Sequence, residues 1–344
     1  MPGLNYNYNY NYNYAAGGGG GGARQFRERF NTDYYTRLGV LYSPAPPPPF
    51  LVPNWAHPPG GPFTQYRPFE TNWDSDLRAY TYLNIFKTAI DAAANTAERN
   101  RSGNPAAIGN WITEYQNYIT NPVTGSGAGL RPPHLMNQAT LDLQIRRMLD
   151  LSLEREPRFC EIIDQDDGDG AINYLLGMLH IDPARHPNTR LMVSIGRRIG
   201  EFVVMCLKGT YMSPRPSQLA PAITPMFDPP VTPAFPAGHA LQSYLISYLV
   251  GYSLRNLPGH NCPAAPAYPN PTGVGIAPTL AGGLLFDLAG RISENRIVAG
   301  LHYPADIEAG LAVAVRCFND IRSLMPTEWT ALSQGVQAEF PQYT

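Results

Sequence analysis

The chain has 344 residues, of which 15% are charged, and a formal net charge of −2. This length allows a large core to be buried, and the near-neutral charge gives no reason to expect a nucleic-acid partner. No stretch reaches about eighteen uninterrupted apolar residues, and no basic segment followed by an apolar run opens the chain. We therefore expect no membrane span, no signal peptide and, by default, a cytoplasmic protein.

The first part of the chain has a composition typical of segments that build no core of their own. Residues 1–22 contain five Asn-Tyr repeats and six consecutive glycines, and residues 43–63 contain nine prolines. Such segments have too few buriable side chains to offset the entropy of folding. We predict a low-complexity, Pro-rich arm over residues 1–65 and a helical catalytic domain over residues 66–344. An arm of this kind can join copies of the chain, so we expect a homo-oligomer.

The later part of the chain is predicted to be all-α, a helical bundle of roughly eight or more helices. Apolar residues recur at helical spacing in six stretches, and no convincing alternating strand is present. The stretches are residues 74–100, 137–156, 189–209, 239–254, 278–300 and 304–324. One long break interrupts this pattern, because eight prolines fall between Pro214 and Pro236. These prolines predict an extended, stiff segment without a helix.

Three short stretches carry residue types suited to binding a tetrahedral oxyanion. Lysine supplies a point charge, and arginine supplies a planar fork that matches paired oxygens. A glycine lets the backbone approach closely and donate its N–H, and histidine exchanges protons near neutral pH. The stretches are LKGTYMSPRPS with Lys208 and Arg215, TPAFPAGHALQSY with Gly238 and His239, and ENRIVAGLHYPADIEAG with Arg296, His302 and Asp306.

The third stretch also predicts a local geometry. Pro304 suits the first position of a helix, so His302 should lie just before a helix N-terminus, where an anion is favoured. Asp306 would then lie in the first turn, close enough to hold one ring nitrogen of His302 and fix its tautomer. At about 4 Å and an effective dielectric constant near 20, each cation contributes on the order of 4 kcal/mol of attraction to a unit negative charge before desolvation. Three cations can therefore hold a multiply charged anion.

Together the three stretches resemble the signature shared by vanadium-dependent haloperoxidases and type 2 phosphatidic acid phosphatases, a superfamily with an all-helical fold. The resemblance covers about residues 208–306. It implies that the cations bind the equatorial oxygens of vanadate or phosphate and that Gly238 donates its N–H. It also implies that His239 is the acid/base group at the apical oxygen. His302 would be the ligand of vanadium, or the nucleophile in a phosphatase, with Asp306 behind it.

Several features favour the haloperoxidase branch. The proline-rich approach PPVTPAFPAGHA, with Phe235 as its aromatic residue, resembles haloperoxidases. The expected lack of membrane helices and of a signal peptide argues against lipid phosphatases and secreted acid phosphatases. The resemblance then implies vanadate as cofactor, with hydrogen peroxide, a halide and a small organic acceptor as partners. Met205 and Thr232 stand where chloride-oxidising relatives carry aromatic side chains, which favours bromide and iodide.

One departure from the pattern keeps other interpretations open. Ala237 stands in the oxyanion-binding stretch where both branches usually have serine, so one hydroxyl donor is missing. The first alternative is a soluble phosphatase that hydrolyses phosphomonoesters with His302 as nucleophile and no metal. The second is a non-catalytic member that binds an oxyanion or assembles through its N-terminal arm.

Overall fold

The computed structural model describes residues 74–120, 129–182, 184–255 and 283–340. Within these ranges every regular element is a helix and no β-strand is present, so the all-α prediction is confirmed. Among the helices described there, none is both long enough and apolar enough to cross a membrane. The predicted arm over residues 1–65, and its boundary with the helical domain, lie outside the described residues.

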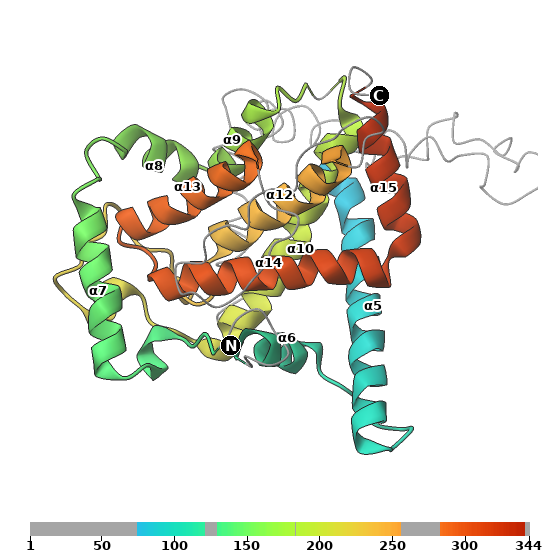
Figure 1. Cartoon of the computed structure of the whole chain (residues 1–344), viewed down its shortest axis with the longest axis horizontal. Helices are drawn as coiled ribbons and strands as arrows, with labels where there is room; N and C mark the ends of the chain where they lie inside the picture. The colour runs from blue at the N-terminus through green and yellow to red at the C-terminus, as the bar shows by residue number, and fades with distance from the viewer. Residues whose placement is uncertain (1–73, 121–128, 183, 256–282, 341–344) are drawn as a thin grey trace, which may run out of the picture. The chain divides into compact units, whose positions relative to one another are not determined.

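The six predicted helical stretches each correspond to a helix of the structure, and shorter helices fall between and after them. The helical elements are α5 (Ser75–Ser102), α6 (Trp111–Thr120), the 3₁₀ turn η2 (Pro133–Leu135), α7 (Gln138–Ser152), α8 (Phe159–Asp166), α9 (Gly170–Met178), α10 (Pro187–Tyr211), α11 (Pro216–Leu219), α12 (Gly238–Arg255), α13 (Leu284–Val298), α14 (Pro304–Leu324) and α15 (Pro326–Ala338). All of them except η2 and α11 are labelled in Figure 1.

Helix α12 lies at the centre of the main hydrophobic core, where it packs against α10, α13 and α14 (Figure 1). Small residues let these helices approach closely. A Cβ at Gly310 of α14 would lie 2.7 Å from the carbonyl oxygen of Ala237 and 2.9 Å from the Cβ of Ala240. A Cβ at Gly200 of α10 would lie 2.8 Å from the side chain of Leu241. The start of α12, which carries Gly238 and His239, is therefore held tightly between α10 and α14.

A second, smaller hydrophobic cluster supports the segment that leads into α14. Met148 and Leu151 of α7 and Ile162 of α8 are buried there. They pack in one cluster with the last two residues of α13 and with residues 299, 301 and 303, which lie between α13 and α14. Helices α7 and α8 thus pack against the segment that carries His302 and hold it in place.

The proline-rich segment between α10 and α12 contains one departure from the sequence prediction. The prediction excluded a helix there, but α11 forms a single turn at Pro216–Leu219. Pro216 occupies the first helical position, where its missing N–H has no intrahelical partner to lose and its fixed φ favours the helix. The rest of the segment is tied to its neighbours, since the Ala234 N–H donates to the Ser213 carbonyl and the Met226 N–H donates to the Ala299 carbonyl, each at 2.9 Å.

The close contact between α12 and α14 gives a direct test of this packing. We predict that Gly310→Ala destabilises the protein by about 1–3 kcal/mol, because backbone atoms of α12 cannot move away from the new methyl group without shifting the helix. Gly177→Ala in α9 is the matched control, since no atom lies within 4 Å of the added Cβ, and it should be neutral or stabilising by up to about 1 kcal/mol. Urea unfolding measures both, and equal stability of the Gly310→Ala and wild-type proteins would contradict the packing.

Candidate active site

Lys208 lies in the last turn of α10, and its ammonium group is buried. It donates to the carbonyl oxygen of Pro233 and to that of Ala234, the latter at 3.2 Å. These bonds connect α10 to the loop that precedes α12. Burial is the main cause that lowers the pKa of Lys208 well below its usual value, and the charge of Arg215 lowers it further, while Asp306 opposes both.

Arg215 precedes α11 and is fixed by four hydrogen bonds in the site. Its Nε donates to the Thr232 carbonyl at 2.9 Å, and its Nη2 lies 3.1 Å from the Thr232 hydroxyl. Its Nη1 donates to the Leu301 carbonyl at 2.9 Å and lies 3.0 Å from Nε2 of His302. The guanidinium plane is therefore held in one orientation, with one edge directed at the histidine.

His302 and Asp306 form a buried pair at the start of α14. The Nδ1 atom of His302 lies 3.2 Å from Oδ2 of Asp306, and the same oxygen accepts the N–H of Tyr303 at 2.9 Å. A carboxylate oxygen accepts hydrogen bonds, so Asp306 favours the His302 tautomer that carries its hydrogen on Nδ1 and a lone pair on Nε2. Burial is the main cause that lowers the pKa of His302 well below its usual value, followed by the charges of Arg215 and Lys208. Both causes disfavour the protonated imidazole, whose Nε2 lies 3.0 Å from Nη1 of Arg215.

Asp306 also joins the two helices that carry the histidines. Its side chain is fully buried, which raises its pKa to about 7, although the Tyr303 N–H and the charge of Lys208 act in the opposite direction. Its backbone carbonyl accepts the N–H of Ala237 at 2.9 Å. Ala237, the residue in the usual serine position, is itself fully buried. This bond keeps the start of α12 in a fixed position next to the start of α14.

Gly238 and His239 form the first turn of α12. A Cβ added at Gly238 would contact one protein atom within 4 Å, Cγ1 of Val204 at 3.8 Å. The packing of the described residues therefore does not require glycine at this position, in contrast to Gly310. His239 lies close enough to His302 that its charge lowers the pKa of His302.

Arg296 lies in the last turn of α13, and its side chain is fully buried. Its Nη2 donates to the Ile162 carbonyl of α8 at 3.0 Å. Its charge also lowers the pKa of His302, although less than the charges of Arg215 and Lys208 do. The structure therefore brings all the sequence-predicted site residues into one region, and it engages part of the Arg296 guanidinium with a helix that the sequence analysis did not connect to the site.

The groups that the sequence analysis missed are mostly backbone carbonyls. Pro233, Ala234, Leu301 and Ile162 each present a carbonyl oxygen to one of the cations. A carbonyl gives no signal in residue type, so only the fold could place it. Thr232 was singled out for the aromatic side chain it lacks, whereas the structure shows that it holds Arg215 with both its carbonyl and its hydroxyl.

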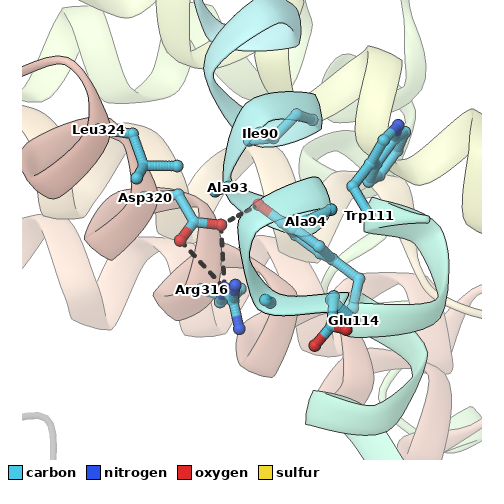
Figure 2. Close-up of a pocket in the computed structure, with 10 residues that line it drawn as sticks. Ile90, Ala93, Ala94, Trp111, Glu114, Arg316, Asp320 and Leu324 are labelled. Carbon is cyan, nitrogen blue, oxygen red and sulfur yellow. Dashed lines mark hydrogen bonds and ion pairs between the residues drawn. The ribbon is translucent and has the colours of Figure 1, made fainter. Parts of the chain in front are cut away.

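A cavity of about 60 Å³ lies elsewhere in the domain, between α5, α6 and α14 (Figure 2). Arg316 Nε donates to both oxygens of Asp320 at 3.0 and 2.9 Å, and the Tyr115 hydroxyl donates to Asp320 at 2.8 Å. These polar groups therefore satisfy one another. Arg316 lies ten residues after Asp306 along α14, a rise of about 15 Å, so this cavity is separate from the candidate active site.

Comparison with known proteins agrees with this placement. Residues 190–329 match the PAP2 superfamily, and this part of the chain is a PAP2 superfamily domain. The matched range contains every predicted site residue from Lys208 to Asp306. Members of this superfamily are enzymes that include phosphatases and haloperoxidases. A search of the curated proteins gave no match to the chain.

The pKa shifts predict that anion binding takes up protons. A bound anion favours the protonated form of Lys208, the amine whose pKa burial lowers well below its usual value in the free site. Affinity should therefore fall as pH rises, by up to about tenfold per pH unit for each proton taken up. Sulfate is a suitable probe, because it remains a dianion across the neutral range.

Isothermal titration of sulfate in buffers of different ionisation enthalpy measures this uptake. The Lys208→Met variant should bind sulfate more weakly and take up fewer protons, because the variant lacks the amine. Sulfate affinity that does not change between about pH 6 and pH 9, with no proton uptake, would contradict the assignment.

Proposed function

We propose that this protein is a vanadium-dependent haloperoxidase that oxidises halide with hydrogen peroxide, with vanadate held at His302. The observation that carries the proposal is the buried His302, whose Nδ1 lies 3.2 Å from Oδ2 of Asp306 and whose Nε2 lies 3.0 Å from the buried guanidinium of Arg215. An imidazole nitrogen of this kind is a suitable ligand for a transition metal. The PAP2 superfamily match of residues 190–329 supports the proposal at the level of the superfamily.

The residues of the site fit vanadate. Lys208, Arg215 and Arg296 are each at most 5% exposed, and Asp306 is the carboxylate whose charge opposes theirs. Burying an excess of positive charge is costly unless an anion accompanies it. The Cβ direction at Gly238 is open, which leaves room for such an anion beside the backbone N–H groups at the start of α12.

The chemistry that vanadate supplies when bound is Lewis-acid activation of hydrogen peroxide toward attack by halide. The chain's own residues have separate tasks in this proposal. Lys208, Arg215 and Arg296 hold the negative oxygens, and the Gly238 N–H donates to one of them. His239 accepts and returns a proton at its imidazole. Asp306 keeps the hydrogen on Nδ1 of His302, so that Nε2 stays available.

The choice of halide rests on two positions. Thr232 holds Arg215, and Met205 is partly buried against the main core. Neither supplies the aromatic side chain that the resemblance associates with chloride oxidation. We therefore propose bromide or iodide as the substrate and a small organic molecule as the acceptor.

A soluble phosphatase is the second candidate, and the PAP2 superfamily match supports it only at the same level, that of the superfamily. In that reaction Nε2 of His302 attacks the phosphorus, the P–N bond forms and the ester P–O bond breaks. His239 gives a proton to the leaving alcohol, and water then releases phosphate. The same cations would stabilise the charge on the transferred group.

Bromination of a phenolic dye by the purified protein with hydrogen peroxide and bromide tests the proposal. We expect activity only after vanadate is added, and a loss of at least about 10²-fold in the His302→Ala variant. His186→Ala, at the opposite end of α10 from Lys208, is the matched control and should retain full activity.

Two results would contradict the haloperoxidase proposal. Bromination that does not depend on added vanadate would show that vanadate is not the cofactor of this activity. Absence of bromination, together with hydrolysis of a phosphomonoester that vanadate inhibits, would assign the chain to the phosphatases.

Ala237 gives a second prediction. A hydroxyl restored at this position by Ala237→Ser should tighten binding of vanadate by about 1.5–3 kcal/mol, the typical contribution of a hydrogen bond to a charged group. Vanadate titration of the wild-type and variant proteins measures the difference. Weaker binding by the variant would show that the buried alanine is required by packing instead.

A further inference from the structure

Charged and amide side chains join helix α8, which carries Glu161, to the last turns of α13; Figure 1 labels both helices. The carboxylate of Glu161 accepts from Arg291 Nε at 3.0 and 3.1 Å and from Arg291 Nη2 at 2.8 Å. It also accepts from Asn295 Nδ2 at 2.8 Å. Arg291 and Asn295 are four residues apart, so a single carboxylate holds two successive turns of α13 on one face.

A second charged residue fixes the same helix from the same side. Arg158 is almost fully buried, and its Nη1 donates to Glu294 Oε2 at 2.7 Å and to Asn295 Oδ1 at 3.2 Å. The side-chain amide of Asn295 is therefore bonded at both its oxygen and its nitrogen. A side chain held at both ends cannot rotate without breaking a buried hydrogen bond.

The residue that follows Asn295 is Arg296. Its guanidinium donates to the carbonyl of Ile162, the residue that follows Glu161. Two successive residues of α8 thus contact two successive residues of α13. Glu161 binds the side chain of Asn295, and the carbonyl of Ile162 binds the side chain of Arg296. These contacts fix the rotation of α13 about its axis, and with it the direction in which the Arg296 side chain leaves the helix.

We propose that Glu161 is a positioning residue for Arg296 and sets the anion affinity of the site from outside the PAP2 superfamily domain. Glu161, Arg158 and Ile162 all precede the matched range of residues 190–329. The inference rests on the proposed function, since it takes Arg296 to be an anion-binding residue. Residues behind the first layer of a metal site typically change its affinity by about 10–100-fold.

Vanadate affinity of the full chain, measured by isothermal titration, tests the proposal with the Glu161→Gln variant. We expect affinity to fall about 10-fold or more, while the unfolding midpoint without vanadate changes little. Glu114→Gln is the matched control, because Glu114 of α6 also pairs with an arginine, Arg101 of α5, and this pair lies on neither α8 nor α13. The control variant should bind vanadate as the wild type does.

A double-mutant cycle separates positioning from a general structural effect. In an Arg296→Ala background, Glu161→Gln should cause no further loss of affinity, because no guanidinium remains to be positioned. An equal loss in both backgrounds would overturn the proposal. Wild-type affinity in the Glu161→Gln variant would overturn it as well. A wild-type protein that binds no vanadate would instead overturn the proposed function.

A second variant, Arg291→Gln, tests the same proposal if the Glu161→Gln variant does not fold. Arg291→Gln breaks the same ion pair at a side chain that is 41% exposed, where substitution is better tolerated. It should lower vanadate affinity in the same direction, by a smaller factor, because Asn295 still donates to Glu161. Unchanged affinity in this variant would overturn the proposal.

Discussion

The candidate site is organised around buried positive charge, because the side chains of Lys208, Arg215 and Arg296 all lie in the interior close to His302. Backbone carbonyls of Pro233, Ala234, Leu301 and Ile162 accept from the cations, but these neutral dipoles solvate positive charge without cancelling it. The pKa of Lys208 is accordingly lowered by burial and by Arg215. A multiply charged anion would remove this imbalance, which is why we propose that the site binds one.

The helical framework keeps these groups in place by two different means. On one side, close packing at Gly200 and Gly310 fixes the start of α12, which carries Gly238 and His239. On the other side, α7 and α8 support the segment between α13 and α14 through a small hydrophobic cluster. Glu161 of α8 also binds Arg291 and Asn295 of α13 itself. The PAP2 superfamily domain contains the proposed site residues, and helices that precede it, α7 and α8, contact the end of α13 and the segment that follows it.

The sequence predicted the parts of this arrangement that depend on local pattern. Long helices such as α10 and α14 follow from apolar spacing, and Pro304 begins α14 as its preference for the first helical position indicates. The single turn of α11 and the short helices α8 and α9 were not predicted, because they have only 4, 8 and 9 residues and helices this short depend on tertiary contacts. The same reason applies to Glu161, since its partners lie about 130 residues further along the chain.

The most direct measurement is a crystal structure of the protein with vanadate, in which anomalous scattering locates the vanadium. We predict one vanadium per chain bonded to Nε2 of His302, with Lys208, Arg215 and Arg296 around its oxygens. Vanadium found away from His302, or a site that stays empty at saturating vanadate, would contradict the proposal that these buried cations hold an oxyanion at that histidine.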